Sequence, residues 1–131
     1  MGEKRLALVA EWLKKADNDL RAAILIFDKQ EDNTDNVCFH CQQAAEKYLK
    51  AYLVSLGVDF PKTHSLSHLS TLIGTYKSVP DSIIDLLEGL ESYSVEVRYP
   101  TGFMDRLYSE AKDALDAAIE IQRFFKGFLA I

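Results

Sequence analysis

The sequence predicts an all-α protein, an up-and-down antiparallel bundle of four long helices plus one short helix. Three observations lead to this prediction. Apolar residues recur every three or four positions in four long segments, which is the period of an amphipathic helix. No segment alternates polar and apolar residues as a half-buried strand would. The chain of 131 residues has only six glycines and three prolines, so few positions interrupt helices.

Length and charge restrict the class of protein. We expect a single domain over residues 1–131, since this length suits one hydrophobic core. The net charge of -5 argues against duplex DNA binding through a general basic surface. No apolar run approaches the ~18 residues of a membrane span. Only two cysteines are present, and the first residues carry no signal-peptide cleavage site, so we expect a cytoplasmic protein.

The first two helices are defined by their apolar stripes. The first is expected to run to residue 27, with a stripe formed by Trp12, Ala16, Leu20, Ala23 and Phe27. The second is expected over residues 37–56, with a stripe formed by Cys38, Cys41, Ala45, Tyr48, Tyr52 and Leu56. Gly57 is placed to end the second helix in the left-handed conformation.

Three further helices follow. A short helix is expected over residues 66–76, capped by Thr63 or Ser65, with Gly74 weakening its last turn. The next should start at Pro80 and stop before Pro100, with a stripe formed by Ile83, Leu87, Leu90, Tyr93 and Val97. The last has the most regular stripe: Met104, Leu107, Ala111, Ala114, Ala118, Ile121, Phe125 and Phe128. Its alanines should let neighbouring helices approach closely.

The cysteines and histidines raise the question of a metal site. Cys38 and Cys41, followed by His64 and His68, imitate a zinc-binding pattern. The intervening segment is too long for the usual finger and is mostly helical. Both cysteines also lie on the apolar side of their helix, where a free cysteine behaves as a small hydrophobe. We therefore expect core packing and no metal.

The polar side of the second helix is a candidate binding face. His40, Gln43, Lys47 and Lys50 fall within one arc of about 80° opposite the cysteines. One interpretation is a solvated face with Glu46 and Lys50 paired, and composition favours it. The other is a recognition face whose lysines bind phosphates or carboxylates.

Two loop segments could contribute to such a face. Lys62, Thr63 and His64 precede a helix whose free amide groups attract anions, although Thr63 could merely cap and His64 merely pack. Arg98 and Tyr99 stand near the end of a helix beside Pro100. The arginine could offset the helix dipole or hold a phosphate with both guanidinium arms, with the tyrosine as a stacking partner.

Four segments in order, "WLKKADNDLRAA", "CFHCQQAAEKYLKAYL", "KTHSLSHL" and "YSVEVRYP", resemble the HEPN domain (higher eukaryotes and prokaryotes nucleotide-binding). The resemblance extends from Trp12 to about Phe125. It implies a helical bundle that forms a homodimer and works with a small nucleotidyltransferase-fold protein, as a toxin–antitoxin-like pair or a split nucleotidyltransferase. Some members of this family bind nucleotides or polyphosphates, and others cleave RNA.

The ribonucleases of that family carry an arginine, a spacer of roughly four to six residues, and a histidine. Here Arg98 is followed at residues 103–105 by Phe, Met and Asp, so the motif is absent and no catalytic residue is assigned. The resemblance implies a ligand-binding set with no cofactor: Gln43, Lys47, Lys50, Lys62, His64, Arg98 and Tyr99.

Three hypotheses follow from the sequence. The first is a homodimer that binds a nucleotide or other phosphate-bearing ligand, with a nucleotidyltransferase partner. The second is an RNA-cleaving toxin in which Arg98 acts with His64 or His40. The third is a module that contacts only other proteins.

Overall fold

The computed structural model describes residues 2–29, 34–93 and 108–129. Within these ranges every regular element is helical, which confirms the all-α prediction. The elements in chain order are α1 (Glu3–Asp28), α2 (Thr34–Ser55), α3 (Leu66–Gly74), α4 (Asp81–Leu90), the 3-10 turn η1 (Glu91–Tyr93) and α5 (Tyr108–Leu129).

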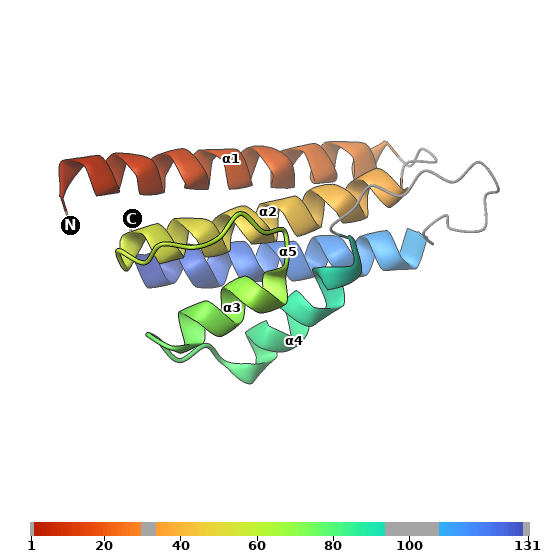
Figure 1. Cartoon of the computed structure of the whole chain (residues 1–131). Coiled ribbons are helices and arrows are strands. Elements are labelled where there is room, and N and C mark those ends of the chain that lie inside the picture. The colour runs from red at the N-terminus through yellow and green to blue at the C-terminus, as the bar shows by residue number, and fades with distance from the viewer. Residues whose placement is uncertain (1, 30–33, 94–107, 130–131) are drawn as a thin grey trace.

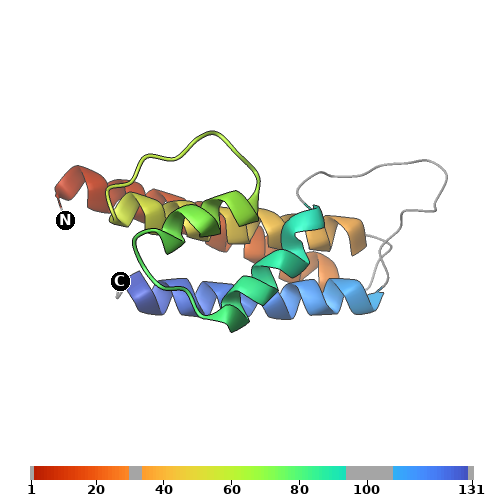
Figure 2. The same ribbon diagram turned by 60° about the horizontal axis from the view of Figure 1, so that its bottom comes forward.

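The helix α2 is the centre of the bundle and contacts α1, α3, α4 and α5. Figure 1 shows α2 and α5 running in the same direction, opposite to α1. The segment 56–65 leaves the end of α2 and returns along it before α3 begins, as Figures 1 and 2 both show. This return carries residues from the loop back to the middle of α2, where the polar residues of that helix lie.

Helix ends follow part of the predicted chemistry, although α2 begins at Thr34 instead of residue 37 and α3 ends at Gly74 instead of residue 76. Gly57 has φ 72° and ends α2 in the left-handed region. Ser65, the second of the two expected candidates, caps α3 by accepting a hydrogen bond from the His68 amide at 3.1 Å. Pro80 precedes the first turn of α4 and is not part of it. The same helix ends at Leu90 and gives way to η1, so the α-helical part is shorter than predicted.

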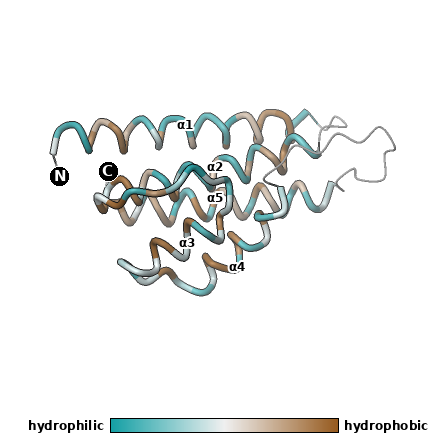
Figure 3. The backbone as a smooth tube through the Cα atoms, viewed as in Figure 1, coloured by the Kyte–Doolittle hydropathy of each residue, from teal (hydrophilic) through white to brown (hydrophobic). Residues whose placement is uncertain are grey.

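The core confirms most of the predicted stripes. The three predicted alanines of α5, Ala111, Ala114 and Ala118, are buried, and this helix packs against both α2 and α4. Hydrophobic and hydrophilic residues alternate along the helices in Figure 3, as amphipathic helices require. In α1 the buried stripe is Val9, Leu13, Ala16, Leu20 and Ala23. The predicted end members of that stripe, Trp12 and Phe27, are only partly buried, whereas Val9 and Leu13, which the predicted stripe left out, are buried. Val97, Met104 and Leu107 lie outside the described residues.

None of the helices in the described ranges is both long enough and apolar enough to cross a membrane. Both cysteines of α2 are buried and unoxidised, in agreement with core packing. Burial raises the pKa of Cys41, with the neighbouring Cys38 as a second cause, so the Cys41 thiol stays protonated near neutral pH.

Candidate functional site

The polar side of α2 is partly covered, since His40, Gln43 and Lys47 are half-buried. Gln42, Glu46 and Lys50 are all buried, although composition favoured an exposed face. The cause is the long-range arrangement of the chain, because the returning segment 56–65 lies along this side of α2 and α1 lies beside it. Buried polar groups need partners, so the interactions of this face decide what it can do.

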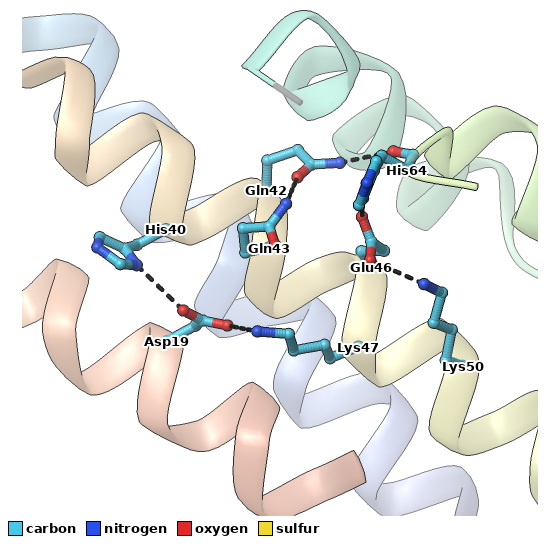
Figure 4. Close-up of polar contacts among 8 residues, drawn as sticks. All are labelled: Asp19, His40, Gln42, Gln43, Glu46, Lys47, Lys50 and His64. Carbon is cyan, nitrogen blue, oxygen red and sulfur yellow. Dashed lines mark hydrogen bonds and ion pairs between the residues drawn. The ribbon is translucent and has the colours of Figure 1, made fainter. Parts of the chain in front are cut away.

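One group of interactions centres on Glu46, whose side chain is 3% exposed. Lys50 donates to Glu46 Oε2 at 2.9 Å, which confirms the predicted pairing of these two residues. His64 Nδ1 donates to the other oxygen, Oε1, also at 2.9 Å. Figure 4 shows both contacts converging on the one carboxylate. We call Glu46, Lys50 and His64 the Glu46 cluster.

Amide side chains attach the loop to α2 beside this cluster. Gln42 donates to the backbone carbonyl of His64 at 2.8 Å, and Gln43 donates to Gln42 Oε1 at 2.8 Å (Figure 4). The loop residue His64 is therefore held through its backbone and through its ring. The contacts with Gln42 and Glu46 fix the backbone and the ring of His64 relative to α2.

Lys50 is engaged by contacts inside the fold. Its ammonium binds Glu46 and also lies 5.5 Å from the ring centroid of Trp12 and 5.9 Å from that of Phe60. Cation–π contacts of this length are favourable, particularly when the cation is desolvated. Lys50 thus joins α2, α1 and the loop from inside the fold.

A second group centres on Asp19 of α1. Its Oδ1 accepts a hydrogen bond from His40 Nδ1 at 3.0 Å, and its Oδ2 accepts one from Lys47 Nζ (Figure 4). Burial raises the pKa of Asp19, but the hydrogen bonds and charges of His40 and Lys47 outweigh burial and leave the pKa below its ordinary value. Lys47 therefore points toward α1 and neutralises an internal carboxylate, away from the Glu46 cluster.

A third group connects three helices through Asp17. Its Oδ1 accepts hydrogen bonds from Tyr48 of α2 and, at 3.1 Å, from Gln122 of α5, and its Oδ2 accepts one from Lys126 at 2.7 Å. Burial raises the pKa of Asp17, but these hydrogen bonds and the charge of Lys126 lower it further than burial raises it. The sequence reasoning missed Asp17 and Asp19. The sequence did contain one signal that these aspartates face other helices, because Asp17 directly follows the buried Ala16 and Asp19 directly precedes the buried Leu20.

The two aspartates predict a pH dependence of stability. Both have a pKa in the folded protein below the ordinary 3.8, so their stabilisation is present above that value and is lost as the pH falls through the lowered pKa. We expect the free energy of unfolding, measured with urea from pH 7 to 3, to fall at the acid end. The double variant Asp17→Asn, Asp19→Asn should show a smaller fall. Asp116→Asn, in an exposed pair with Lys112, is the control, and an equal flattening there would contradict the assignment.

Residues 9–128 match the model of one protein family, the HEPN domain. The chain belongs to the HEPN family. A curated relative, "Putative toxin MJ1304" of Methanocaldococcus jannaschii, is 28% identical over 90% of this chain and 86% of its own length. Among solved structures, TT1696 of Thermus thermophilus is 27% identical with a TM-score of 0.78, covering 91% of this chain and 96% of that one. The archaeal HEPN homologue ST0689 is 26% identical with a TM-score of 0.74, covering 91% and 95%.

The structure brings together only part of the predicted ligand set of this HEPN domain. Gln43, Lys50 and His64 lie on one side of α2, whereas Lys47 is bound to α1. Lys62 is exposed on the returning loop. Arg98 and Tyr99 lie outside the described residues.

The metal interpretation gains no support within residues 2–29, 34–93 and 108–129, because no three metal-binding side chains gather there. His64 instead uses one ring nitrogen on Glu46. The ring is 71% exposed, and Nε2 has no protein partner in the described part of the chain. An imidazole whose Nδ1 is fixed on a carboxylate can accept a proton or donate a hydrogen bond through Nε2. This is the chemically available group of the site.

Proposed function

We propose that this HEPN domain binds a phosphate-bearing ligand, a nucleotide or an RNA end, at the loop edge that carries Lys62 and His64. The observation that supports the proposal most is the Glu46–His64 contact, since a buried carboxylate holds an exposed imidazole in one orientation. An ordered ring gives up less entropy on binding than a free one.

The charges favour an anion at this edge. Inside the fold Glu46 is already neutralised by Lys50 at 2.9 Å, so a proton on His64 adds a net positive charge to the cluster. Lys62 adds a second cation two positions earlier in the chain. A phosphate group could accept hydrogen bonds from the Lys62 ammonium and from His64 Nε2. Lys47 and Lys50 are compensated internally, so we assign them to holding the fold.

The proposal includes partners. As a HEPN domain of this length, the chain would form a homodimer and work with a nucleotidyltransferase-fold protein. The similarity to a protein named as a toxin supports a place on the toxin side of such a pair. Arg98 and Tyr99 would complete the ligand-binding surface. Purification of the chain together with the product of a neighbouring gene, followed by light scattering, tests both associations.

Calorimetric titration with ATP and GTP at two salt concentrations tests ligand binding. We expect measurable affinity that weakens with added salt, and a loss of about fivefold to tenfold for His64→Ala or Lys62→Ala, since each removes one charge-assisted contact. Arg98→Ala should weaken binding similarly. His68→Ala is the matched control, because this exposed histidine lies close by in the chain, in the first turn of α3. Absence of heat at millimolar nucleotide would contradict the proposal.

A second candidate function is RNA cleavage with His64 as the general base. The same contact supports it, because a carboxylate on Nδ1 leaves Nε2 free to take a proton from a ribose hydroxyl. Incubation with total RNA, with His64→Ala and Arg98→Ala beside the unaltered protein, tests this function. Identical products from all three proteins would reject it.

A further inference from the structure

A separate pocket lies where the first turns of α1 meet the end of α2 and the start of the returning loop. The start of α1 and the end of α2 are adjacent in Figure 2. It is a groove open to solvent, and its volume of about 680 Å³ lies within the range of about 300–1,000 Å³ that is usual for small-molecule sites. Its apolar lining consists of Leu8, Trp12, Val54, Val58 and Phe60. None of these residues belongs to the Glu46 cluster.

The aromatic walls of the pocket are fixed from inside. Trp12 and Phe60 meet edge to face, with ring centroids 6.3 Å apart and an angle of 65° between their planes. Lys50 lies within 6 Å of both centroids and is itself anchored to Glu46. The two rings therefore form a preformed surface against which another aromatic ring can pack with favourable geometry.

The rim of the pocket is cationic on one side. Lys4 and Arg5 contribute two positive charges and Asp59 one negative charge. Neither cation forms an ion pair with another residue in the described ranges. Both belong to the first turn of α1, whose amide groups add further positive potential. Glu3 in the same turn of α1 and Asp59 at the rim offset part of this charge, so the attraction for an anion is local to the Lys4 and Arg5 side chains.

Gly57 explains how the cationic side is positioned. A Cβ atom at this glycine would lie 2.9 Å from Arg5 Nη2, so the guanidinium lies directly over the backbone that ends α2. The carbonyl end of α2 carries partial negative charge, which partly offsets Arg5. Lys4 has no such compensation and is the residue most available to a bound anion.

We propose that this pocket binds a small molecule that combines a planar aromatic ring with one anionic group. The ring would pack against Trp12 and Phe60, and the anion would lie at Lys4 and Arg5. The size of the pocket and its one-sided charge favour such a ligand over an apolar peptide or a second copy of the chain. This inference does not depend on the proposed function, because it uses neither His64 nor Lys62.

Titration with 8-anilinonaphthalene-1-sulfonate tests the proposal, since this probe has the required ring and anion. Trp12 is the only tryptophan of the chain, so excitation of tryptophan should give energy transfer to probe bound beside it. Leu8→Asp should abolish the transfer, and Lys4→Glu should weaken binding about tenfold. Both residues are exposed, so the variants should fold as the unaltered protein does, which circular dichroism checks.

The chain offers matched controls for both variants. Leu25 lies on the same helix and is 56% exposed against 49% for Leu8, so Leu25→Asp should leave binding within about twofold. Lys15→Glu is the control for charge. His64→Ala should bind the probe normally even though it binds nucleotide about fivefold to tenfold more weakly. Binding that is insensitive to Leu8→Asp and Lys4→Glu would overturn the proposal, and so would a dimer by light scattering that Leu8→Asp dissociates.

Discussion

Replacing Glu46 by alanine is expected to lower the free energy of unfolding by about 3–5 kcal/mol, because it leaves the buried Lys50 ammonium without its counter-charge. The same change releases His64 from the 2.9 Å contact that orients its ring. Urea denaturation at pH 7 measures the first effect. Calorimetric titration with ATP on the remaining folded protein measures the second.

Two comparisons separate a buried charge pair from an ordinary one. Asp116→Ala breaks an exposed pair with Lys112 and should cost no more than about 0.5 kcal/mol. The double variant Glu46→Leu, Lys50→Met removes both charges and should recover much of the lost stability, since two apolar side chains can replace a buried ion pair. If Glu46→Ala costs no more than Asp116→Ala, the Glu46 cluster does not hold the loop on α2.

Replacing Phe125 by alanine is expected to cost about 3–5 kcal/mol, because its ring is fully buried where α5 meets α2. The ring lies 5.7 Å from Tyr52 and 4.9 Å from Phe124, measured between centroids. Thermal and urea denaturation measure the loss.

Phe128 provides the matched control on the same helix. Its ring stacks on Tyr52 at 4.9 Å but is 40% exposed, although the stripe predicted it to be a core residue. We expect Phe128→Ala to cost clearly less than Phe125→Ala, since little cavity forms at a surface position. Equal losses would contradict the described burial of α5.

The fold could be predicted from the sequence because helical periodicity is local. The alanines of α5, the left-handed Gly57 and the serine cap at Ser65 each act within a few residues of the chain. The orientation of α1 was less accurate. Val9 and Leu13 face the core, and Trp12 faces the Lys50 ammonium. The spacing of apolar residues does not show which of them will contact a cation instead of the core.

The site was harder to predict because its contacts join distant segments. His64 is 18 positions from Glu46, and Lys47 is 28 positions from Asp19. The sequence placed Lys47 and Lys50 on one polar face and paired Lys50 with Glu46, but it held no information about the carboxylate that binds Lys47 or the histidine that covers Glu46. Whether a lysine on α2 is free for a ligand depends on the path of the segment 56–65, which only the three-dimensional arrangement specifies.

The central claim is that the imidazole of His64 faces the ligand while its Nδ1 stays on Glu46. Nitrogen-15 NMR of the ring atoms tests it most directly, because the chain has only three histidines. On titration with AMP, the account predicts that the Nε2 resonance of His64 shifts while the signals of His40 and His68 stay nearly unchanged. A titration that leaves the ring signals of His64 in place, or that moves those of His68 equally, would contradict it.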